Sequence, residues 1–399
     1  MNPIFLKAIP LLEKVEKAGF EAYFVGGCVR DFILGKKIAD VDIATSATPQ
    51  EIKAIFEKTI DVGIEHGTVI VLWGKDTYEL TTFRSDGEYM DFRRPSEVKF
   101  IRSLEEDLKR RDFTMNSMAM DKKGRIIDPF CGQKAIRNKR IETVGLAENR
   151  FHEDALRMMR AVRFVSQLSF SIELNTSIAL RKNAFLLEKI ATERKCVEFE
   201  KLLIGINRKS AFQILLDTNL FLYLPGLFGH EEGLRKMADF DYESLTIDEM
   251  WSLLIYLMEV DSMEVEGFLR QWKLPVKKIK RIKSGLTWLH FRIHSEWSIE
   301  TLYEAGIEQV QQVERLNNIL LHQSVNQSLP KLIEQYDQLI IKSREELAVS
   351  GLDLMQWDSR KGGPWVKERL VLIEKAVLNG EITNQKESIK EWLSKCNLS

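Results

Sequence analysis

The stretch 25-VGGCVRDFILGKKIADVDIAT-45 combines two adjacent glycines, an arginine and a pair of aspartates. Gly26 and Gly27 can bring backbone N–H groups close to a phosphate because neither residue carries a Cβ atom. Arg30 follows at a spacing that lets its planar guanidinium hold phosphate oxygens. The sequence has neither a G-x-x-x-x-G-K-[ST] loop nor a G-x-G-x-x-G turn opening a helix, which disfavours a P-loop ATPase and a dinucleotide-binding fold.

Asp40 and Asp42 are expected on one β-strand, where side chains two positions apart point to the same face. Two carboxylates this close repel each other unless a cation lies between them, and hard oxygen ligands favour Mg²⁺. An isolated D-x-D more often marks exposed aspartates beside a turn. The glycine pair and Arg30 just before it favour the metal site, so we predict that Asp40 and Asp42 are catalytic metal ligands.

Glu79, in the segment YELTTF, is the candidate for a third carboxylate. Two-metal nucleotidyl transfer needs such a group near the attacking oxygen. Glu79 is expected on a neighbouring strand, where an exposed structural glutamate is an equal alternative. The sequence leaves these two interpretations open.

Composition limits the class of protein. The 399 residues predict roughly two to four domains, and 44% of them are hydrophobic, as in a soluble globular protein. The 58 basic and 59 acidic residues give a net charge of -1, so any nucleic-acid binding must rely on local basic patches.

The cysteines and the apolar runs indicate the compartment. Cys28, Cys131, Cys196 and Cys396 are far apart and match no zinc spacing, so we interpret them as reduced thiols. No apolar run reaches the ~18 residues that a membrane span needs. We therefore expect a cytoplasmic protein that does not enter the membrane.

The pattern along the chain predicts an α+β protein: a small head with a mixed sheet, then helices only. Segments rich in β-branched and aromatic residues predict strands at 21–26, 40–45, 68–73 and 77–83. Capping boxes predict helices over 48–58 and 103–110. From about residue 149 apolar residues recur every three or four positions, which predicts a string of helices.

Four motifs occur in a fixed order: G-G-x-V-R-D, D-x-D-I-A-T, RRDFTMNSMA (110–119) and EDALRMMRAVRF (153–164). In this order and spacing the sequence resembles the class II CCA-adding enzymes. These tRNA nucleotidyltransferases belong to the polymerase-β-like superfamily, which also contains the bacterial poly(A) polymerases. The resemblance implies that the chain adds C, C and A to the tRNA 3′ end from CTP and ATP, without a nucleic-acid template, releasing pyrophosphate.

The resemblance also implies a domain order and further site residues. The head would be followed by an elongated all-α neck, body and tail, with no obligatory protein partner evident. The expected boundaries are 1–145 for the catalytic head, 146–205 for the neck with base recognition, 206–290 for the body, and 291–399 for the tRNA-binding tail. The additional residues expected at the nucleotide are Arg111, Asp112, Asn116, Arg160 and Arg163.

Asp154 and Arg157 are the candidates for base selection. If EDALRMMRAVRF is one helix, these residues are three positions apart and share a face. Cytosine and adenine each offer an exocyclic amino donor beside a ring-nitrogen acceptor, which a carboxylate and a guanidinium can meet. An ordinary intrahelical ion pair is the alternative, and the resemblance assigns base recognition to this pair.

Further segments carry weaker signals. The polar stretch 84–100 resembles the family's flexible loop, which helps the site switch from CTP to ATP. The segment 193–203 resembles the next family motif but has Lys195 and Cys196 where an apolar residue and an arginine are expected. The segment 350–384 resembles the tail that holds tRNA. Two basic clusters that could bind tRNA phosphates, or simply be solvated surfaces, are 277–283 and 136–140.

Three alternatives remain. A bacterial poly(A) polymerase shares the first three motifs, although such enzymes usually carry basic extensions. A specialised CC-adding or A-adding relative is disfavoured by the complete loop at 84–100. A non-catalytic tRNA-binding module is disfavoured by the intact Asp40 and Asp42.

Overall fold

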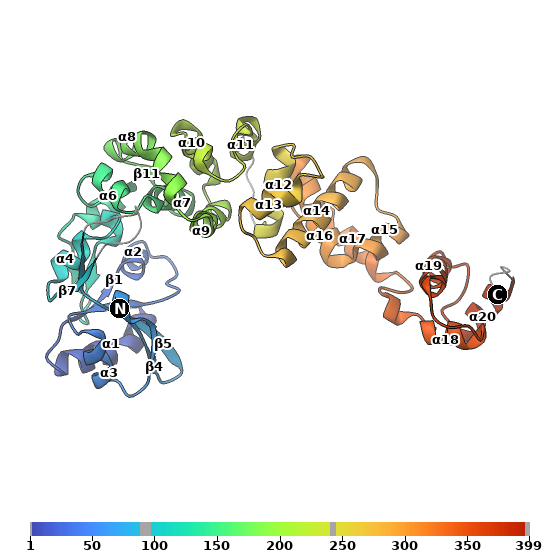
Figure 1. Ribbon diagram of the computed structural model, residues 1–399, viewed down its shortest axis with the longest axis horizontal. Coiled ribbons are helices and arrows are strands. Elements are labelled where there is room, and N and C mark those ends of the chain that lie inside the picture. The colour runs from blue at the N-terminus through green and yellow to red at the C-terminus, as the bar shows by residue number, and fades with distance from the viewer. Residues whose placement is uncertain (1, 88–96, 240–244, 396–399) are drawn as a thin grey trace. The chain divides into compact units, whose positions relative to one another are not determined.

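The computed structural model describes residues 2–87, 97–239 and 245–395 (Figure 1). The chain divides into two compact units. The first comprises Met1–Asp239 with Gly267–Lys273, and the second comprises Phe240–Glu266 with Leu274–Ser399.

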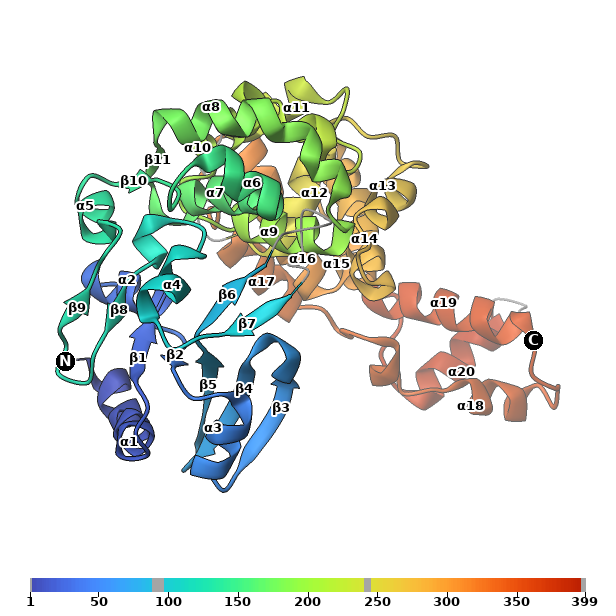
Figure 2. The same cartoon turned by 60° about the vertical axis from the view of Figure 1, so that its left-hand side comes forward.

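The first unit starts with a mixed seven-stranded sheet in the order β3-β4-β5-β2-β1-β8-β9 (Figure 2). Only β2 and β5 run parallel; the other neighbouring strands are antiparallel. The strands are β1 (Ala22–Val25), β2 (Asp42–Thr45), β3 (Thr59–Gly63), β4 (Thr68–Trp73), β5 (Asp76–Thr82), β8 (Ala119–Met120) and β9 (Ile126–Ile127). The four predicted strands are confirmed, whereas β3, β8 and β9 were not predicted.

Both faces of this sheet are covered near β1. Helices α1 (Pro3–Lys17) and α3 (Pro49–Ile55) pack against one face and against each other (Figure 2), and the ring of Phe5 lies 4.7 Å from that of Phe24. Val25, on the opposite face, joins a small core with Phe83 and Leu108. Burial of β1 on both sides fixes the position of the glycine turn that follows it.

The predicted helix starts are present. At α3 the Glu51 N–H donates to Thr48 Oγ1 and the Thr48 N–H donates to Glu51 Oε2, which confirms the capping box. At α4 (Leu104–Lys109) the Glu106 N–H donates to the Ser103 hydroxyl. Both helices end earlier than predicted, at Ile55 and Lys109.

A two-stranded ribbon follows the sheet. It consists of β6 (Arg84–Asp86) and β7 (Val98–Phe100), paired antiparallel. These strands form the two ends of the predicted loop 84–100. Residues 88–96, to which the prediction of a CTP-to-ATP switch applies, lie outside the described residues.

Helices continue the first unit from residue 147 onward. In its core, α7 packs against α9 and α10, and Phe199 stacks on Trp272 with ring centroids 4.6 Å apart. The elements from residue 132 are α5 (Gly132–Arg137), β10 (Arg140–Ile141), α6 (Ala147–Glu153), α7 (Leu156–Leu168), β11 (Ser171–Ile172), α8 (Leu174–Asn183), α9 (Thr192–Leu203), α10 (Arg208–Asp217) and α11 (Glu231–Asp239).

Lys195 and Cys196, which depart from the expected motif, are both buried in α9. Lys195 Nζ donates to the carbonyls of Leu187 and Tyr223, each at 3.2 Å. Burial lowers the pKa of Lys195. The lysine thus joins two backbone segments that are 36 residues apart in sequence.

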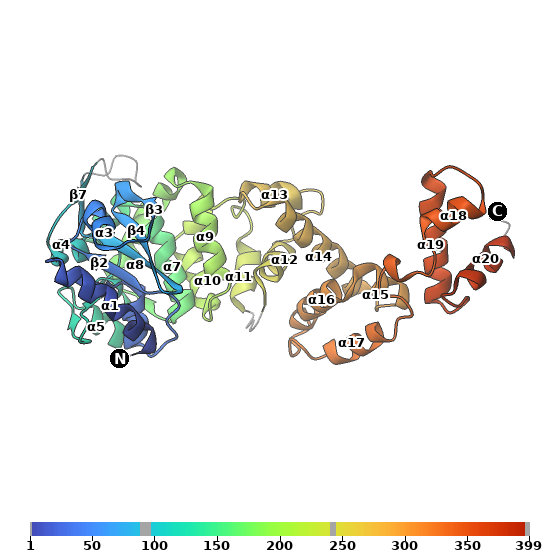
Figure 3. The ribbon, with the colours of Figure 1, turned by 90° about the horizontal axis from the view of Figure 1, so that it is seen from below.

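The second unit is helical in all its described regular elements. Helices α12, α14 and α16 are mutual neighbours (Figure 3). The helices are α12 (Ile247–Leu257), α14 (Val276–His294), α15 (Ile299–Ala305), α16 (Ile307–Leu320), α17 (Leu329–Asp337), α18 (Gly351–Trp357), α19 (Pro364–Leu378) and α20 (Lys386–Lys395), and α13 (Val265–Gln271) spans the boundary between the units.

Part of the predicted basic cluster at 277–283 is engaged in ion pairs. Arg281 pairs with Asp248 at 2.6 Å, and Lys283 pairs with Glu266 at 2.7 Å. These contacts favour the interpretation of α14 as a solvated helix surface.

No helix in the described parts of the chain is both long and apolar enough to cross a membrane.

Candidate active site

The glycine pair forms the turn between β1 and α2 (Gly27–Ile33). Gly26 has φ +74°, a conformation that glycine adopts without strain. A Cβ atom at Gly26 would lie 3.0 Å from Arg111 Nη1, and one at Gly27 would lie 3.8 Å from Arg30 Nη2. The missing side chain at Gly26 therefore leaves room for the Arg111 guanidinium, while the binding of a phosphate at this turn stays a prediction.

A Gly26→Ala substitution is expected to lower kcat/KM for CTP by at least about 10-fold, because it strains the backbone and displaces Arg111. Gly35→Ala is the matched control. Gly35 also has positive φ, +65°, but an added Cβ there meets no atom within 4 Å. Measurements of Tm should show similar destabilisation in both variants. Steady-state kinetics should show a loss of activity only in Gly26→Ala. Equal activity in both would contradict a role for the close approach.

Asp42 is the first residue of β2, and Asp40 precedes the strand. The prediction that both lie on one strand is therefore wrong for Asp40. The two carboxylates are nevertheless close enough to interact. Burial raises the pKa of Asp42, Arg111 lowers it, and the charge of Asp40 raises it further. The repulsion that the sequence predicted is thus present.

Glu79 lies on β5 directly beside Asp42, because the parallel register pairs these two residues. Adjacent residues in this register point to the same face of the sheet. Burial raises the pKa of Glu79, and the charge of Asp42 adds to that effect. Among the described residues, no three His, Cys, Asp or Glu side chains are gathered closely enough to form a ready-made metal cluster.

A cavity of about 500 Å³ opens beside this turn. Seven arginines and three aspartates line it, so its charge favours a polyanion. Asp40 and Glu79 do not line it. The lining residues predicted from the sequence are Gly26, Gly27, Arg30, Asp42, Arg111, Asp112, Asn116, Asp154, Arg157, Arg160 and Arg163, and those not predicted are Arg110, Leu156, Phe164, Gln167 and Arg194.

Asp112 and Asn116 anchor two of the arginines. Arg160 pairs with the Asp112 carboxylate at 2.6 Å, and Arg30 Nη1 donates to Asn116 Oδ1 at 2.8 Å. Burial raises the pKa of Asp112, but the charges of Arg160 and Arg157 outweigh it and hold the pKa at about 2. Asp112 is therefore ionised at neutral pH and orients Arg160 toward the cavity.

Phe164 and Glu198 order Arg163, one of the buried arginines of the site. The Arg163 guanidinium lies 4.1 Å from the Phe164 ring centroid and pairs with Glu198 at 2.7 Å. Burial lowers the pKa of Arg163 to about 10, with Glu198 opposing the shift. Arg30 lies over the same ring at 5.2 Å. Arg160 lies over it at 5.7 Å, so one aromatic ring contacts three cations that would otherwise repel each other more strongly.

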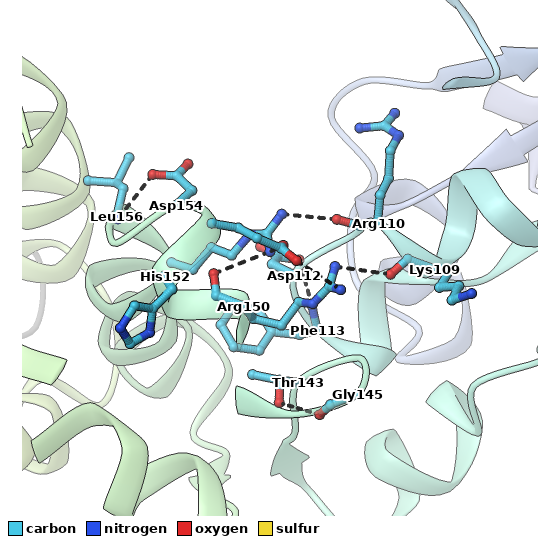
Figure 4. Close-up of polar contacts among 12 residues, drawn as sticks. Lys109, Arg110, Asp112, Phe113, Thr143, Gly145, Arg150, His152, Asp154 and Leu156 are labelled. Atoms are coloured by element: carbon cyan, nitrogen blue, oxygen red, sulfur yellow. Dashed lines mark hydrogen bonds and ion pairs between the residues drawn. The ribbon is translucent and has the colours of Figure 1, made fainter. Parts of the chain in front are cut away.

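The segment EDALRMMRAVRF is not one helix. Helix α6 ends at Glu153, Asp154 has extended backbone angles, and α7 begins at Leu156. The Asp154 carboxylate accepts a hydrogen bond from the Leu156 N–H, as Figure 4 shows. The predicted shared helix face is therefore wrong, because Asp154 occupies the junction between two helices and Arg157 the first turn of the second.

Asp154 and Arg157 still line the same cavity, but each has another partner. Arg157 donates to the Glu153 carboxylate at 2.6 Å and to the Arg110 carbonyl at 2.9 Å. Asp154 forms a two-point ion pair with Arg194, on α9, at 2.8 and 3.3 Å. The alternative interpretation, an ordinary intrahelical ion pair between Asp154 and Arg157, is therefore wrong, because both side chains contact other residues instead.

Comparisons with known proteins agree along the whole chain. Residues 22–142 match the Poly A polymerase head domain, 169–229 the RNA and SrmB-binding site of polymerase A, and 243–393 tRNA nucleotidyltransferase domain 2. A CCA-adding enzyme of Geobacillus sp. (strain WCH70) is 48% identical over 100% of this chain and 98% of its own length. The chain belongs to the CCA-adding enzyme family.

Solved structures of CCA-adding enzymes support the same assignment. The Bacillus stearothermophilus CCA-adding enzyme in complex with CTP is 47% identical, covers 100% of this chain and 98% of its own, and has a TM-score of 0.93. The chain is thus a nucleotidyltransferase that acts in CCA addition, as the motifs predicted, and the poly(A) polymerase alternative is not favoured. Nucleotidyltransferases of this family use divalent metal ions.

Proposed function

We propose that the chain adds C, C and A in turn to the 3′ end of tRNA, using CTP and ATP, and that the residues of the arginine-lined cavity select both nucleotides without a template. The observation that carries this proposal is the convergence of the Gly26–Gly27 turn, Asp42 and seven arginines on one cavity. The CTP bound by the Bacillus stearothermophilus relative supports it.

Arg30 and Arg111 are the proposed holders of the triphosphate. Both approach the Gly26–Gly27 turn. The Gly26 N–H donates to the Met118 carbonyl at 3.3 Å, so the two guanidinium groups, rather than that N–H, would hold the anion. Asn116 and Asp107 orient them: Arg111 Nη2 donates to the buried Asp107 carboxylate at 3.1 Å. A guanidinium held in this way loses little conformational freedom when it binds phosphate oxygens.

Asp40 and Asp42 are the proposed ligands of Mg²⁺. Their carboxylates supply hard oxygen donors. Desolvation raises the pKa of Asp42 and the charge of Asp40 adds to that shift, so a cation bound between them would relieve like-charge repulsion. The ion would supply charge stabilisation at the reacting phosphate. Glu79 is the proposed third carboxylate, near the tRNA 3′ oxygen.

The proposed reaction is an in-line displacement. The tRNA 3′ oxygen forms a bond to the α-phosphorus of the nucleotide while the bond to the β-phosphate oxygen breaks. Pyrophosphate leaves, and the hydroxyl proton passes to a carboxylate or to solvent. Arg160 and Arg163 are proposed to stabilise the phosphates, because Asp112 and Glu198 hold them at the cavity wall.

Asp154 and Arg157 are the proposed readers of the base. Asp154 would accept from the exocyclic amino group of cytosine or adenine, and Arg157 would donate to the adjacent ring nitrogen. Uracil and guanine present the reversed pattern and would leave both groups unpaired. The hydrogen bonds of Arg157 to Glu153 and to the Arg110 carbonyl fix its orientation and leave donors for the base.

The head, neck, body and tail boundaries given above remain proposals, as does tRNA binding by the tail at 350–384. A cytoplasmic location is proposed from the tRNA substrate.

The deciding experiment incubates the purified chain with tRNA lacking its 3′ end, CTP, ATP and Mg²⁺, and sequences the products. Addition of C, C and A is the expected result, whereas a homopolymeric A tail, or products stopping at CC, would overturn the proposal.

A further inference from the structure

The Asp154 carboxylate is held by a residue forty positions away in sequence. Arg194 Nη2 donates to Asp154 Oδ2 at 2.8 Å, and Arg194 Nη1 lies 3.3 Å from Oδ1, so the guanidinium and the carboxylate meet along matching edges. Both side chains line the active-site cavity. Their side chains are 18% and 27% exposed, so the pair is partly shielded from water and reachable from the cavity.

This contact supplements the local hydrogen bond of the Asp154 carboxylate. Asp154 lies at the break between α6 and α7, outside any helix, and its backbone alone does not determine the carboxylate plane. The Leu156 N–H at 3.1 Å holds one oxygen, and Arg194 holds both. An ionised carboxylate has about four lone-pair positions, so acceptor capacity remains for a base amino group.

Arg194 acts from a helix that also orders the phosphate-binding arginines. One turn further along α9, Glu198 pairs with Arg163 at 2.7 Å and lies 3.9 Å from Arg160. Residues at i and i+4 of a helix share a face, so α9 presents a cation to Asp154 and an anion to α7. The base side and the phosphate side of the cavity are thus braced by one helix.

We propose that Arg194 is a positioning residue for base selection: it holds the Asp154 carboxylate in the one orientation that accepts from cytosine or adenine. This inference rests on the proposed role of Asp154 as a base reader. Without Arg194, the carboxylate can rotate away from that orientation, so a base amino group loses its acceptor and uracil or guanine is rejected less strongly.

The test compares Arg194→Met and Arg194→Lys with wild type in single-nucleotide addition to tRNA. The ratio of kcat/KM for CTP over UTP, and for ATP over GTP, is expected to fall by about 10-fold in Arg194→Met, the effect of one misplaced hydrogen bond. Arg194→Lys keeps the charge but not the two-point geometry and is expected to restore part of the ratio.

Arg181→Met is the matched control. Arg181 is a neck arginine that donates to the Asp217 carbonyl and does not line the cavity. It should keep the wild-type ratios. If Arg194→Met lowers Tm or the overall rate but leaves both ratios at the wild-type value, Arg194 is only a structural ion-pair partner and the inference fails.

Asp154→Asn separates this inference from the proposed function. If Asp154→Asn itself keeps the wild-type ratios, base reading by Asp154 fails. If Asp154→Asn relaxes the ratios and Arg194→Met does not, only the role of Arg194 fails. The double variant should be no less selective than Asp154→Asn alone, because Arg194 acts through that carboxylate.

Discussion

Asp42→Asn is expected to abolish addition of both C and A, with a loss of at least about 10³-fold in rate, because a bound divalent ion supplies several kcal/mol of charge stabilisation to every phosphoryl step. Asp42 is the one proposed metal ligand that also lines the arginine cavity. Binding of tRNA should remain largely intact. Radiolabelled CTP and ATP incorporation measures the first effect, and filter binding of tRNA the second.

The control for this substitution is Asp61→Asn. Asp61 belongs to the same sheet, on β3, and pairs with Lys53 at the surface. It should keep full activity.

Asp40→Asn should resemble Asp42→Asn, and Glu79→Gln should slow turnover if Glu79 is the third carboxylate. Turnover retained in both the Asp40 and Asp42 variants would refute the metal assignment.

The pH dependence of metal binding follows from the same carboxylates. The pKa of Asp42 is raised by burial and by Asp40, and that of Glu79 by burial and by Asp42. Because both pKa values are raised in the folded protein, the ionised carboxylates destabilise the metal-free fold at any pH above them. As the pH falls through the raised pKa, the carboxylates take up protons and this destabilisation disappears. The Mg²⁺-induced rise in Tm should therefore shrink on acidification, beginning above the ordinary carboxylate range. A Tm increment independent of pH down to about 4 would contradict this.

The double variant Asp154→Asn with Arg157→Gln is expected to incorporate UTP and GTP. Neutral amides can turn to meet either donor-acceptor pattern, so selection should relax by the cost of two mispaired groups, about 2 to 6 kcal/mol in discrimination free energy. Metal chemistry should persist at a reduced rate, and Tm should fall because Arg157 also holds the Arg110 carbonyl. Competition between CTP and UTP, and between ATP and GTP, measures the effect.

Glu148→Gln with Lys182→Gln is the matched control for removing an ion pair. These residues pair at 2.7 Å on the surface of the same helical region. The control should keep the wild-type preference. A double variant at Asp154 and Arg157 that is slower but equally selective would assign base selection to other residues.

Many elements of the N-terminal sheet region could be predicted because they depend on residues that are neighbours in the sequence. The β-branched strands, the Thr48 capping box and the Gly26–Gly27 turn each depend on residues adjacent in sequence, and each is confirmed. The order of four motifs was specific enough to identify the family, and eleven of the predicted site residues line one cavity.

Contacts between distant segments were not predictable in the same way. The motifs did not single out Phe164 or Arg194, and no spacing rule links Arg194 to Asp154. The resemblance of 193–203 to a family motif is the one sequence signal near Arg194, and it does not indicate which residue Arg194 contacts. The junction at Asp154 was missed because apolar periodicity runs through it unbroken.

The sequence by itself determined the class of chemistry: glycines that leave room for phosphate, carboxylates that need a cation, and arginines in numbers that need a polyanion. Only the tertiary structure decided which groups meet. The parallel register of β2 with β5 sets Glu79 beside Asp42, and the packing of α9 on α7 brings Arg194 to Asp154 and Glu198 to Arg163. The reason is physical: a residue's charge and conformational freedom are properties of its own atoms, whereas its partner is chosen by how whole elements pack.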